Sequence, residues 1–222
     1  MKEVEYPSGE VIRLDYDAQR GFPIGETAID ALGNAGTTYR SVKAMSARGM
    51  ATVEQLGNGV NELSRYDDST GLMQVLSAAV GGVLPSPSPT TQCSNVPGTI
   101  VRCTEYKYDQ LRNLVQQSKH FYPVANGTVQ SASPQVTASE TYQYDDLQRI
   151  VAESRGYVNL TPNSPLGETY SYDDTGNILS KIDFDGAYLY GDTTRSQRNA
   201  GPHAVLSVGS ARIYPTMRPK DR

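Results

Sequence analysis

Polar and apolar positions alternate with a period of two along much of the chain, and turn-forming residues interrupt this alternation at short intervals. The triplets 106–108, 142–144 and 170–172 each place one polar residue between two tyrosines. Residues two apart on a β-strand point to the same face. Each triplet therefore predicts a strand with both tyrosines on one face and the intervening Lys107, Gln143 or Ser171 on the other.

A Tyr-Asp pair recurs five times, at Tyr16-Asp17, Tyr66-Asp67, Tyr108-Asp109, Tyr144-Asp145 and Tyr172-Asp173. Aspartate favours turns because its carboxylate accepts the backbone N–H two residues further along. In the last copy, Gly176-Asn177 supplies a position that tolerates positive φ. An aliphatic residue (Leu114, Ile150 or Ile178) then starts the returning strand. Each copy thus predicts a strand, a turn and a strand.

Three more dipeptides indicate hairpins between these copies: Asn58-Gly59, Asn126-Gly127 and Asp185-Gly186. Such pairs are typical of type I′ turns, in which both central residues have positive φ. The predicted fold class is all-β, with repeated antiparallel β-hairpins in one curved, spiralling sheet.

Some copies depart from the repeated pattern. Arg112 and Gln148 occupy the position that is glycine in the last copy, and we expect each to cost about 1 kcal/mol at positive φ. In the first copy the glycine follows the polar residue (Arg20-Gly21), whereas in the last copy the glycine comes first (Gly176-Asn177).

The repeat region is expected to cover residues 1–208, with two insertion loops rich in proline, serine and asparagine at about 81–98 and 155–168. Insertions of this kind in a repeat array are expected to form loops outside the sheet. Residues 209–222 match no repeat, and we expect a disordered tail there.

The Tyr-Asp copies closely resemble the repeats of the RHS, or YD-repeat, family of bacterial proteins. Two further segments carry this resemblance, Asn199-Ala200-Gly201-Pro202-His203-Ala204-Val205 and Tyr6-Pro7-Ser8-Gly9-Glu10-Val11. The resemblance extends over about residues 4–208 and implies that the chain is a fragment of a longer protein.

The family resemblance implies a specific function. Proteins of this family wind their hairpins into a spiralling sheet that can close into a hollow shell around a variable C-terminal toxin domain. They act in interbacterial competition, insecticidal toxin complexes and attachment to cell surfaces. The expected role is a non-catalytic segment of such a shell in a secreted or surface-exposed protein, with neighbouring repeats and a toxin domain as partners. The alternative is a surface module that binds carbohydrate through Tyr106, Tyr142 or Tyr170.

Composition and charge exclude other classes. The net charge of −4 offers no excess of cations for a nucleic-acid backbone. No apolar run approaches the roughly 20 residues of a membrane-spanning helix. The N-terminal segment 1–7 has no apolar signal-peptide core, so the expectation of export rests on the family resemblance.

The only cysteines, Cys93 and Cys103, flank a turn-rich segment. A disulfide in an oxidising compartment and two free thiols both remain open. A metal site is not expected, since four ligands are normally needed and no histidine pair lies nearby in the sequence.

The sequence predicts no catalytic, cofactor-binding or metal-binding residue. Repeated turn aspartates would line up along an edge, whereas acid–base catalysis needs two carboxylates that converge on one substrate. The two histidines, His120 and His203, accompany no nucleophile motif and are expected to have structural or surface roles. The adjacent pairs Asp67-Asp68, Asp145-Asp146 and Asp173-Asp174 lack the spacing of a calcium loop. An enzymatic site within the two insertion loops is the least favoured hypothesis.

Overall fold

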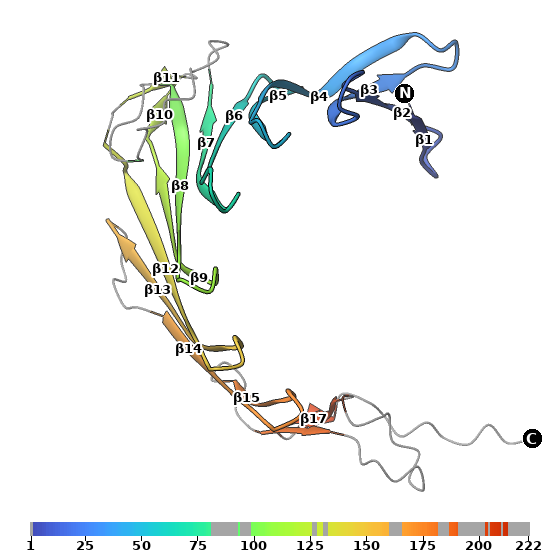
Figure 1. Cartoon of the computed structure of the whole chain (residues 1–222). Helices are drawn as coiled ribbons and strands as arrows, with labels where there is room; N and C mark the ends of the chain where they lie inside the picture. The colour runs from blue at the N-terminus through green and yellow to red at the C-terminus, as the bar shows by residue number, and fades with distance from the viewer. Residues whose placement is uncertain are drawn as a thin grey trace, which may run out of the picture. The chain divides into compact units, whose positions relative to one another are not determined.

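The computed structural model describes residues 2–80, 93, 99–125, 128–130, 133–159, 166–181, 187–190, 203, 205–209 and 211–212. All regular elements within these ranges are β-strands (Figure 1). No helix that is long and apolar enough to cross a membrane occurs in this part of the chain.

Most strands belong to one sheet of 13 strands. Its first seven strands are β1 (Lys2–Glu5), β2 (Val11–Tyr16), β3 (Pro23–Ile29), β4 (Ala35–Met45), β5 (Ala51–Leu56), β6 (Asn61–Tyr66) and β7 (Met73–Ala79). The other six are β8 (Ile100–Tyr108), β9 (Leu114–Phe121), β12 (Val136–Tyr144), β13 (Ile150–Val158), β14 (Leu166–Tyr172) and β15 (Ile178–Lys181).

The spatial order of these strands follows their order along the chain. Each strand between the two ends is hydrogen-bonded to both of its neighbours in this order. The small hairpin of β10 (Val124–Ala125) and β11 (Thr128–Val129) is inserted in the chain between β9 and β12, which pair with each other. A second sheet contains β16 (Tyr188–Tyr190), β17 (Val205–Val208) and β18 (Ala211–Arg212). The predictions of an all-β fold and of repeated antiparallel hairpins are confirmed. The order has two ends, β1 and β15, so the sheet is not closed into a barrel.

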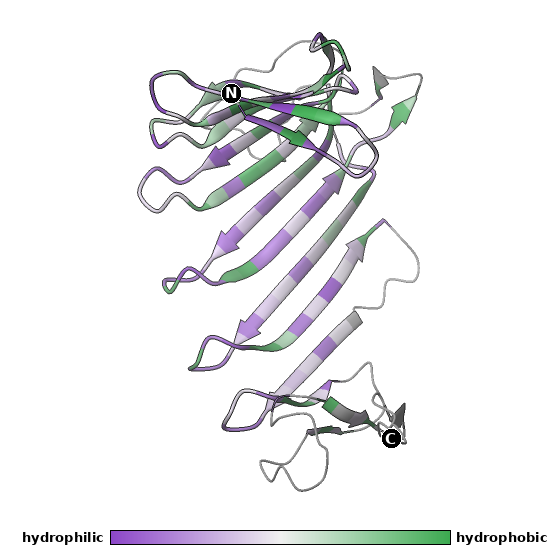
Figure 2. Cartoon of the chain, turned by 90° about the vertical axis from the view of Figure 1, so that its right-hand side faces the viewer, coloured by the Kyte–Doolittle hydropathy of each residue, from purple (hydrophilic) through white to green (hydrophobic). Residues whose placement is uncertain are grey.

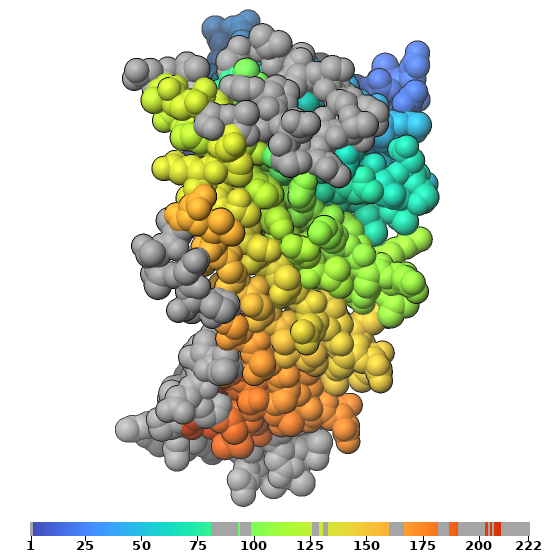
Figure 3. Space-filling model, turned by 90° about the vertical axis from the view of Figure 1, so that its left-hand side faces the viewer, coloured from blue at the N-terminus to red at the C-terminus, as the bar shows by residue number. Residues whose placement is uncertain are grey.

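The chain divides into two compact units. Unit 1 contains Met1–Ser139 and Tyr157–Asn163, and unit 2 contains Glu140–Gly156 and Ser164–Arg222. In unit 1, strands β7, β8 and β9 lie side by side, and their segments are coloured from teal to light green in Figure 3.

The core of unit 1 is small and lies on one face of β7 and β8. Val75 and Ala79 of β7 pack with Ile100 and Cys103 of β8 and with Tyr122. Buried polar residues such as Asn61, Ser77 and Thr104 lie among the buried apolar ones. Hydrophilic bands accordingly recur along the strands in Figure 2. The apolar core of unit 1 is therefore small and is interrupted by buried polar side chains.

The predicted alternation of the tyrosine strands is confirmed. Tyr142 and Tyr144 of β12 are partly buried, whereas Gln143 between them is exposed. Tyr106 and Tyr108 of β8 flank an exposed Lys107 in the same way. The tyrosines therefore occupy the more covered face of each strand, as their spacing of two residues predicts.

Strands reach into two segments that were predicted as a loop and a tail, while the predicted extent of the repeat region stays a prediction. Strands extend into both ends of the predicted 155–168 insertion, because β13 continues to Val158 and β14 begins at Leu166. Residues 211–212 of the predicted tail form β18, which pairs with β17. Within the predicted 81–98 loop only Cys93 is described, and the rest of that loop, like residues 213–222, lies outside the described residues.

Candidate functional site: repeated turns, a tyrosine face and a disulfide cluster

The aspartate of each Tyr-Asp pair organises a turn through its carboxylate. In the last copy, Oδ1 of Asp173 accepts the backbone N–H of Thr175 at 2.9 Å and that of Asn177 at 2.8 Å. Its Oδ2 accepts the side-chain amide of Asn177 at 2.8 Å. Asp145 binds the N–H groups of Leu147 and Arg149 in the same arrangement. The prediction that these aspartates cap turns is confirmed, and it accounts for the recurrence of aspartate.

Seven hairpins share one backbone geometry. In the last copy, the N–H of Asp173 donates to the C=O of Asn177 at 2.9 Å and the N–H of Gly176 donates to the C=O of Asp173 at 3.1 Å. The third residue of this three-residue loop has positive φ, as in a type I turn followed by a bulge. The residues at this position are Gly9, Gly33, Gly49, Gly59, Arg112, Gln148 and Gly176.

The type I′ prediction for Asn58-Gly59 is therefore wrong. The hairpin between β5 and β6 exists, but only Gly59 has positive φ, and the Asn58 side chain accepts the N–H of Val60 at 3.1 Å. The three-residue loop needs only one residue at positive φ, which explains the difference. Residues 126–127 and 182–186, which contain the other two predicted hairpin turns, lie outside the described residues, although β10 and β11 pair on either side of 126–127.

The turns after Tyr16 and Tyr66 are one residue longer. The N–H of Asp17 donates to the C=O of Phe22, and that of Asp67 donates to the C=O of Leu72. Gly21 and Gly71 carry the positive φ. Arg20-Gly21 is thus not a reversal of the repeated pattern, because the extra residue moves the glycine to the position where the backbone needs it.

A sixth aspartate turn follows β3, without a tyrosine. Oδ1 of Asp30 accepts the N–H groups of Leu32 and Asn34, and Gly33 has positive φ. This turn was not predicted, because Ile29 and not a tyrosine precedes the aspartate. The spacing of Asp30, Gly33 and Asn34 equals that of Asp173, Gly176 and Asn177, and it is the signal that would have revealed the turn.

The two non-glycine residues at the bulge position give a first testable prediction. Arg112 has a φ of 72° and Gln148 one of 62°, as the prediction of imperfect turns requires. Replacing either one with glycine should raise the free energy of unfolding by about 1 kcal/mol. The matched controls, Arg112→Ala and Gln148→Ala, keep a Cβ at positive φ and should give no comparable gain in urea unfolding. Equal stability of the Gly and Ala variants would contradict this explanation.

The turn carboxylates also predict how stability depends on pH. Hydrogen bonds from the hydroxyl group of Ser69 and from Thr70 lower the pKa of Asp67 from 3.8 to about 2. Hydrogen bonds from the Thr175 hydroxyl and Asn177 lower the pKa of Asp173 to about 2. Because both folded values lie below the unfolded value, this stabilisation is complete above about pH 4 and is lost as the pH falls towards 2.

Thermal unfolding between pH 5 and pH 2 measures this effect. The Asp67→Asn/Asp173→Asn variant keeps an oxygen acceptor in each turn but cannot titrate there. Its melting temperature should fall less steeply with decreasing pH than that of the unaltered chain. Identical pH profiles would show that these two carboxylates do not contribute to acid sensitivity.

The tyrosine face of unit 2 is occupied by partners from the sheet itself. The Tyr170 hydroxyl donates to Glu168 at 2.5 Å, and the Tyr142 hydroxyl donates to Glu140 at 3.0 Å. The Glu168 carboxylate raises the pKa of Tyr170 to about 12, and burial, followed by Glu140, raises that of Tyr142 to about 12. These phenols are committed to intramolecular hydrogen bonds, so this face offers few unsatisfied groups to an external ligand.

Cations of the same unit cover two of the rings. The Lys181 ammonium lies 5.7 Å from the centre of the Tyr170 ring and 3.2 Å from Glu168. The Arg149 guanidinium lies 4.6 Å from the centre of the Tyr172 ring. These contacts link neighbouring strands, which is a structural role for the tyrosine stripe.

His203 lies beside the last turn of the repeat. Its Nδ1 is 2.8 Å from Oδ1 of Asn177, the residue that closes the Asp173 turn. The predicted structural role of this histidine is consistent with the contact.

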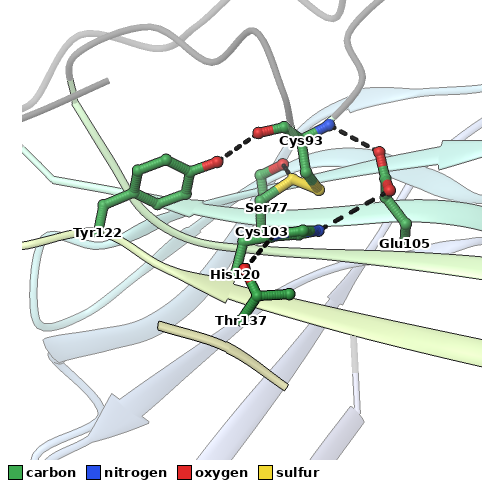
Figure 4. The surroundings of a disulfide bond; sticks show 7 residues. All are labelled: Ser77, Cys93, Cys103, Glu105, His120, Tyr122 and Thr137. Atoms are coloured by element: carbon green, nitrogen blue, oxygen red, sulfur yellow. Dashed lines mark hydrogen bonds and ion pairs between the residues drawn. A yellow bond between two sulfur atoms is a disulfide. The ribbon is translucent and has the colours of Figure 1, made fainter. Parts of the chain in front are cut away.

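In unit 1, Cys93 and Cys103 form a disulfide (Figure 4). Of the two alternatives left open by the sequence, the structure has the bonded one. Two hydrogen bonds also fix Cys93: its N–H donates to Glu105 at 2.8 Å, and its C=O accepts from the Tyr122 hydroxyl. Burial, followed by the negative charge of Glu105, raises the pKa of Tyr122. The insertion loop is thereby attached to the sheet at Cys93.

A histidine lies next to this disulfide, although it is distant from both cysteines in the sequence. His120 of β9 is the register partner of Cys103 on β8. Its Nε2 is 3.8 Å from Oε2 of Glu105, and its Nδ1 is 3.0 Å from Oγ1 of Thr137. We call Cys93, Cys103, Glu105 and His120 the disulfide cluster. Distance along the chain did not reveal this neighbour, because the hairpin around Asp109 pairs Cys103 with His120 across two strands.

Two pockets lie near these strands in unit 1. One is lined by Arg65, Gln74, Glu105, Lys107 and His120, among others, and adjoins the disulfide cluster. The other lies at the adjacent turns and is lined by residues that include Asp67, Tyr106, Tyr108, Asp109 and Arg112. The predicted absence of catalytic and cofactor-binding residues stays a prediction.

No family model and no curated protein matches the chain. Solved structures of toxin-complex proteins do. The Photorhabdus luminescens Tc holotoxin pore with the mutation TccC3-D651A matches 83% of the chain at 18% identity, with a TM-score of 0.53. The crystal structure of TcdB2-TccC3-TEV matches 86% at 17% identity, with a TM-score of 0.56. That of TcdB2-TccC3-Cdc42 matches 87% at 18% identity, with a TM-score of 0.53.

At this level of sequence identity, the similarity between the chain and these solved structures is a similarity of fold. The chain spans only 8%, 9% and 10% of the length of the three solved chains, respectively. The fold of most of the chain therefore recurs as a short part of much larger toxin-complex chains.

Proposed function

We propose that the protein is a non-catalytic structural scaffold, a segment of an RHS-type β-shell that encloses or presents a toxin in a secreted or surface-exposed bacterial protein. One observation carries this proposal: the strands of the 13-stranded sheet lie side by side in the order in which they follow one another in the chain, with only the β10–β11 hairpin left out. In such an array, the free energy of unfolding is approximately the sum of the intrinsic stability of each repeat and the stability of its interface with the next repeat. Strands of further hairpins can therefore pair with the edge strands β1 and β15 without any change in the pairing of the other strands.

Two independent observations support the toxin context. The repeated Tyr-Asp turns resemble a family in which such hairpins form toxin shells. The fold resembles short parts of Tc toxin chains. The disulfide supports an exported location, because disulfides persist in oxidising compartments.

Cross-linking mass spectrometry of the native protein tests whether its edges are occupied. Lys2 is exposed on the edge strand β1, and Lys43 is exposed on the interior strand β4, so the two form a matched pair. In protein isolated from the producing cell, an amine-reactive cross-linker should join Lys2 to a strand of further Tyr-Asp repeats. Lys43 should cross-link only to residues within 1–222, because β3 and β5 already pair with β4 on its two sides. Absence of any Lys2 link beyond residues 1–222 would argue against a continued sheet.

Carbohydrate binding is the alternative function, and the pocket lined by Tyr106 and Tyr108 is the observation that favours it. Aromatic rings beside polar groups are a common way to hold a small ligand in a mostly preformed site. A glycan array with the unaltered chain, Tyr106→Ala and Tyr170→Ala separates the two proposals. Binding that is lost in Tyr106→Ala and kept in Tyr170→Ala would establish a carbohydrate site here. No binding by the folded, unaltered chain would eliminate this alternative.

A further inference from the structure

The disulfide cluster brings together the side-chain types that bind zinc. The ligand atoms of Cys93, Glu105 and His120 all lie within 4.8 Å of one another. Ligands of a tetrahedral zinc ion lie about 3.3–3.8 Å apart, given bonds of about 2.0–2.3 Å. Movements of roughly 1 Å or less per side chain would therefore bring the three atoms to zinc-binding distances.

Cys103 is the natural fourth ligand. It lies directly opposite His120 in the β8–β9 register, and its sulfur is bonded to that of Cys93. Both cysteines are almost completely buried, so their sulfur atoms have little access to solvent. The set of two sulfurs, one imidazole and one carboxylate is chemically suited to zinc, which prefers nitrogen and sulfur ligands in tetrahedral sites.

The histidine is already oriented as a metal ligand. Thr137 Oγ1 lies 3.0 Å from Nδ1, and in the tautomer that carries its proton on Nδ1 this hydrogen bond leaves the lone pair on Nε2. Nε2 is buried, has no hydrogen-bond partner and faces Glu105 (Figure 4). Metal-binding histidines typically donate their second ring nitrogen to such an outer partner, which fixes the orientation of the ring.

Cys93 would keep its place if the disulfide were reduced. Its N–H donates to Oε1 of Glu105 and its C=O accepts from Tyr122, and neither hydrogen bond involves sulfur. Oε2 of the same carboxylate faces His120 and remains available to a metal. The pocket beside the cluster is also lined by Arg65 and Lys107, whose positive charges would offset the negative charge of two thiolates and one carboxylate.

We propose that the reduced protein binds one zinc ion through the four side chains of the disulfide cluster (Cys93, Cys103, Glu105 and His120). Reduction by a cellular dithiol transfers two electrons and two protons, which breaks the S–S bond, yields two thiols and converts the dithiol to its own disulfide. Zinc then displaces both thiol protons as the sulfurs bind. After export, exchange with a disulfide of an oxidising partner protein would take up the two electrons of the thiolates, form the Cys93–Cys103 bond, leave the partner as a dithiol and release the zinc ion. Cys93 would thus be attached to the sheet in both states.

Zinc titration of the full chain in its two redox states tests this proposal. The chain is reduced with a phosphine, which adds no competing thiol, the excess reductant is removed, and the chain is then titrated without oxygen against a chromophoric chelator. We expect one zinc ion per reduced chain and none at comparable affinity in the oxidised chain. Cobalt in place of zinc should show the sulfur-to-metal charge-transfer absorption of a thiolate site.

Variants identify the ligands. His120→Gln and Glu105→Gln should each weaken zinc binding at least tenfold, since loss of even an outer-shell partner has an effect of about that size. His203→Gln removes the only other histidine and should leave the affinity unchanged. Circular dichroism of each reduced variant confirms that it is folded. Absence of stoichiometric zinc binding by the reduced chain, or unchanged binding by folded His120→Gln, would overturn the proposal.

Discussion

Loss of the Cys93–Cys103 disulfide should lower the free energy of unfolding by about 3 kcal/mol. The two cysteines are 10 residues apart in the sequence, and a cross-link that closes a loop of this size restricts the unfolded chain by roughly that amount. The bond also joins the insertion loop to the centre of the unit 1 core, where both cysteines are buried. The effect should therefore be strongest on β7 and β8.

Urea unfolding of the oxidised chain and of a Cys93→Ala/Cys103→Ala variant measures this loss, with a chelator present to exclude metal ions. Hydrogen exchange of the β8 amides provides a local readout, because an array of repeats need not unfold as a single unit. Adding reductant to the double variant is the control and should change nothing. A difference below about 0.5 kcal/mol between the oxidised chain and the variant would show that the loop contributes little to the stability of the sheet.

Replacing Ile100 with alanine should cost about 2–5 kcal/mol. Ile100 is only 2% exposed and belongs to the same core cluster as Val75, Ala79 and Tyr122. This cluster contains few large apolar side chains, so the cavity left by Ile100 cannot be filled by a neighbour without further loss of contacts.

The matched control is Leu32→Ala. Leu32 is 87% exposed in the loop after β3, and its replacement should change the free energy of unfolding by no more than about 0.5 kcal/mol. Urea unfolding followed by circular dichroism compares the two variants. Similar small effects for both would mean that the core around β7 and β8 is not what stabilises unit 1.

The sequence allowed the architecture to be predicted because the determining interactions are local. The turn at Asp173 needs only residues 173–177, and the same carboxylate contacts follow from the same residue spacing at Asp145. Once each turn joins two strands, their pairing follows directly. The strain at Arg112 and Gln148 was predictable for the same reason, since a loop of fixed geometry imposes positive φ on whichever residue occupies that position.

One wrong prediction and one contact that was not foreseen both depended on details beyond this local pattern. Asn58-Gly59 is compatible with more than one hairpin geometry, and only the length of the loop distinguishes them. The contact between His120 and the cysteines requires the register of β8 and β9, which places Cys103 opposite His120 although 17 residues separate them in the sequence. A prediction of pairs across the Asp109 turn would have brought these two residues close together.

The most direct test of the proposed scaffold is electron cryomicroscopy of the native assembly, purified from the cell that produces the protein. We predict that β1 and β15 are each hydrogen-bonded to a further strand, and that the hairpins continue into a closed wall around another polypeptide. A separate particle in which both β1 and β15 have no neighbouring strand would contradict this role and would leave the chain as an independent module.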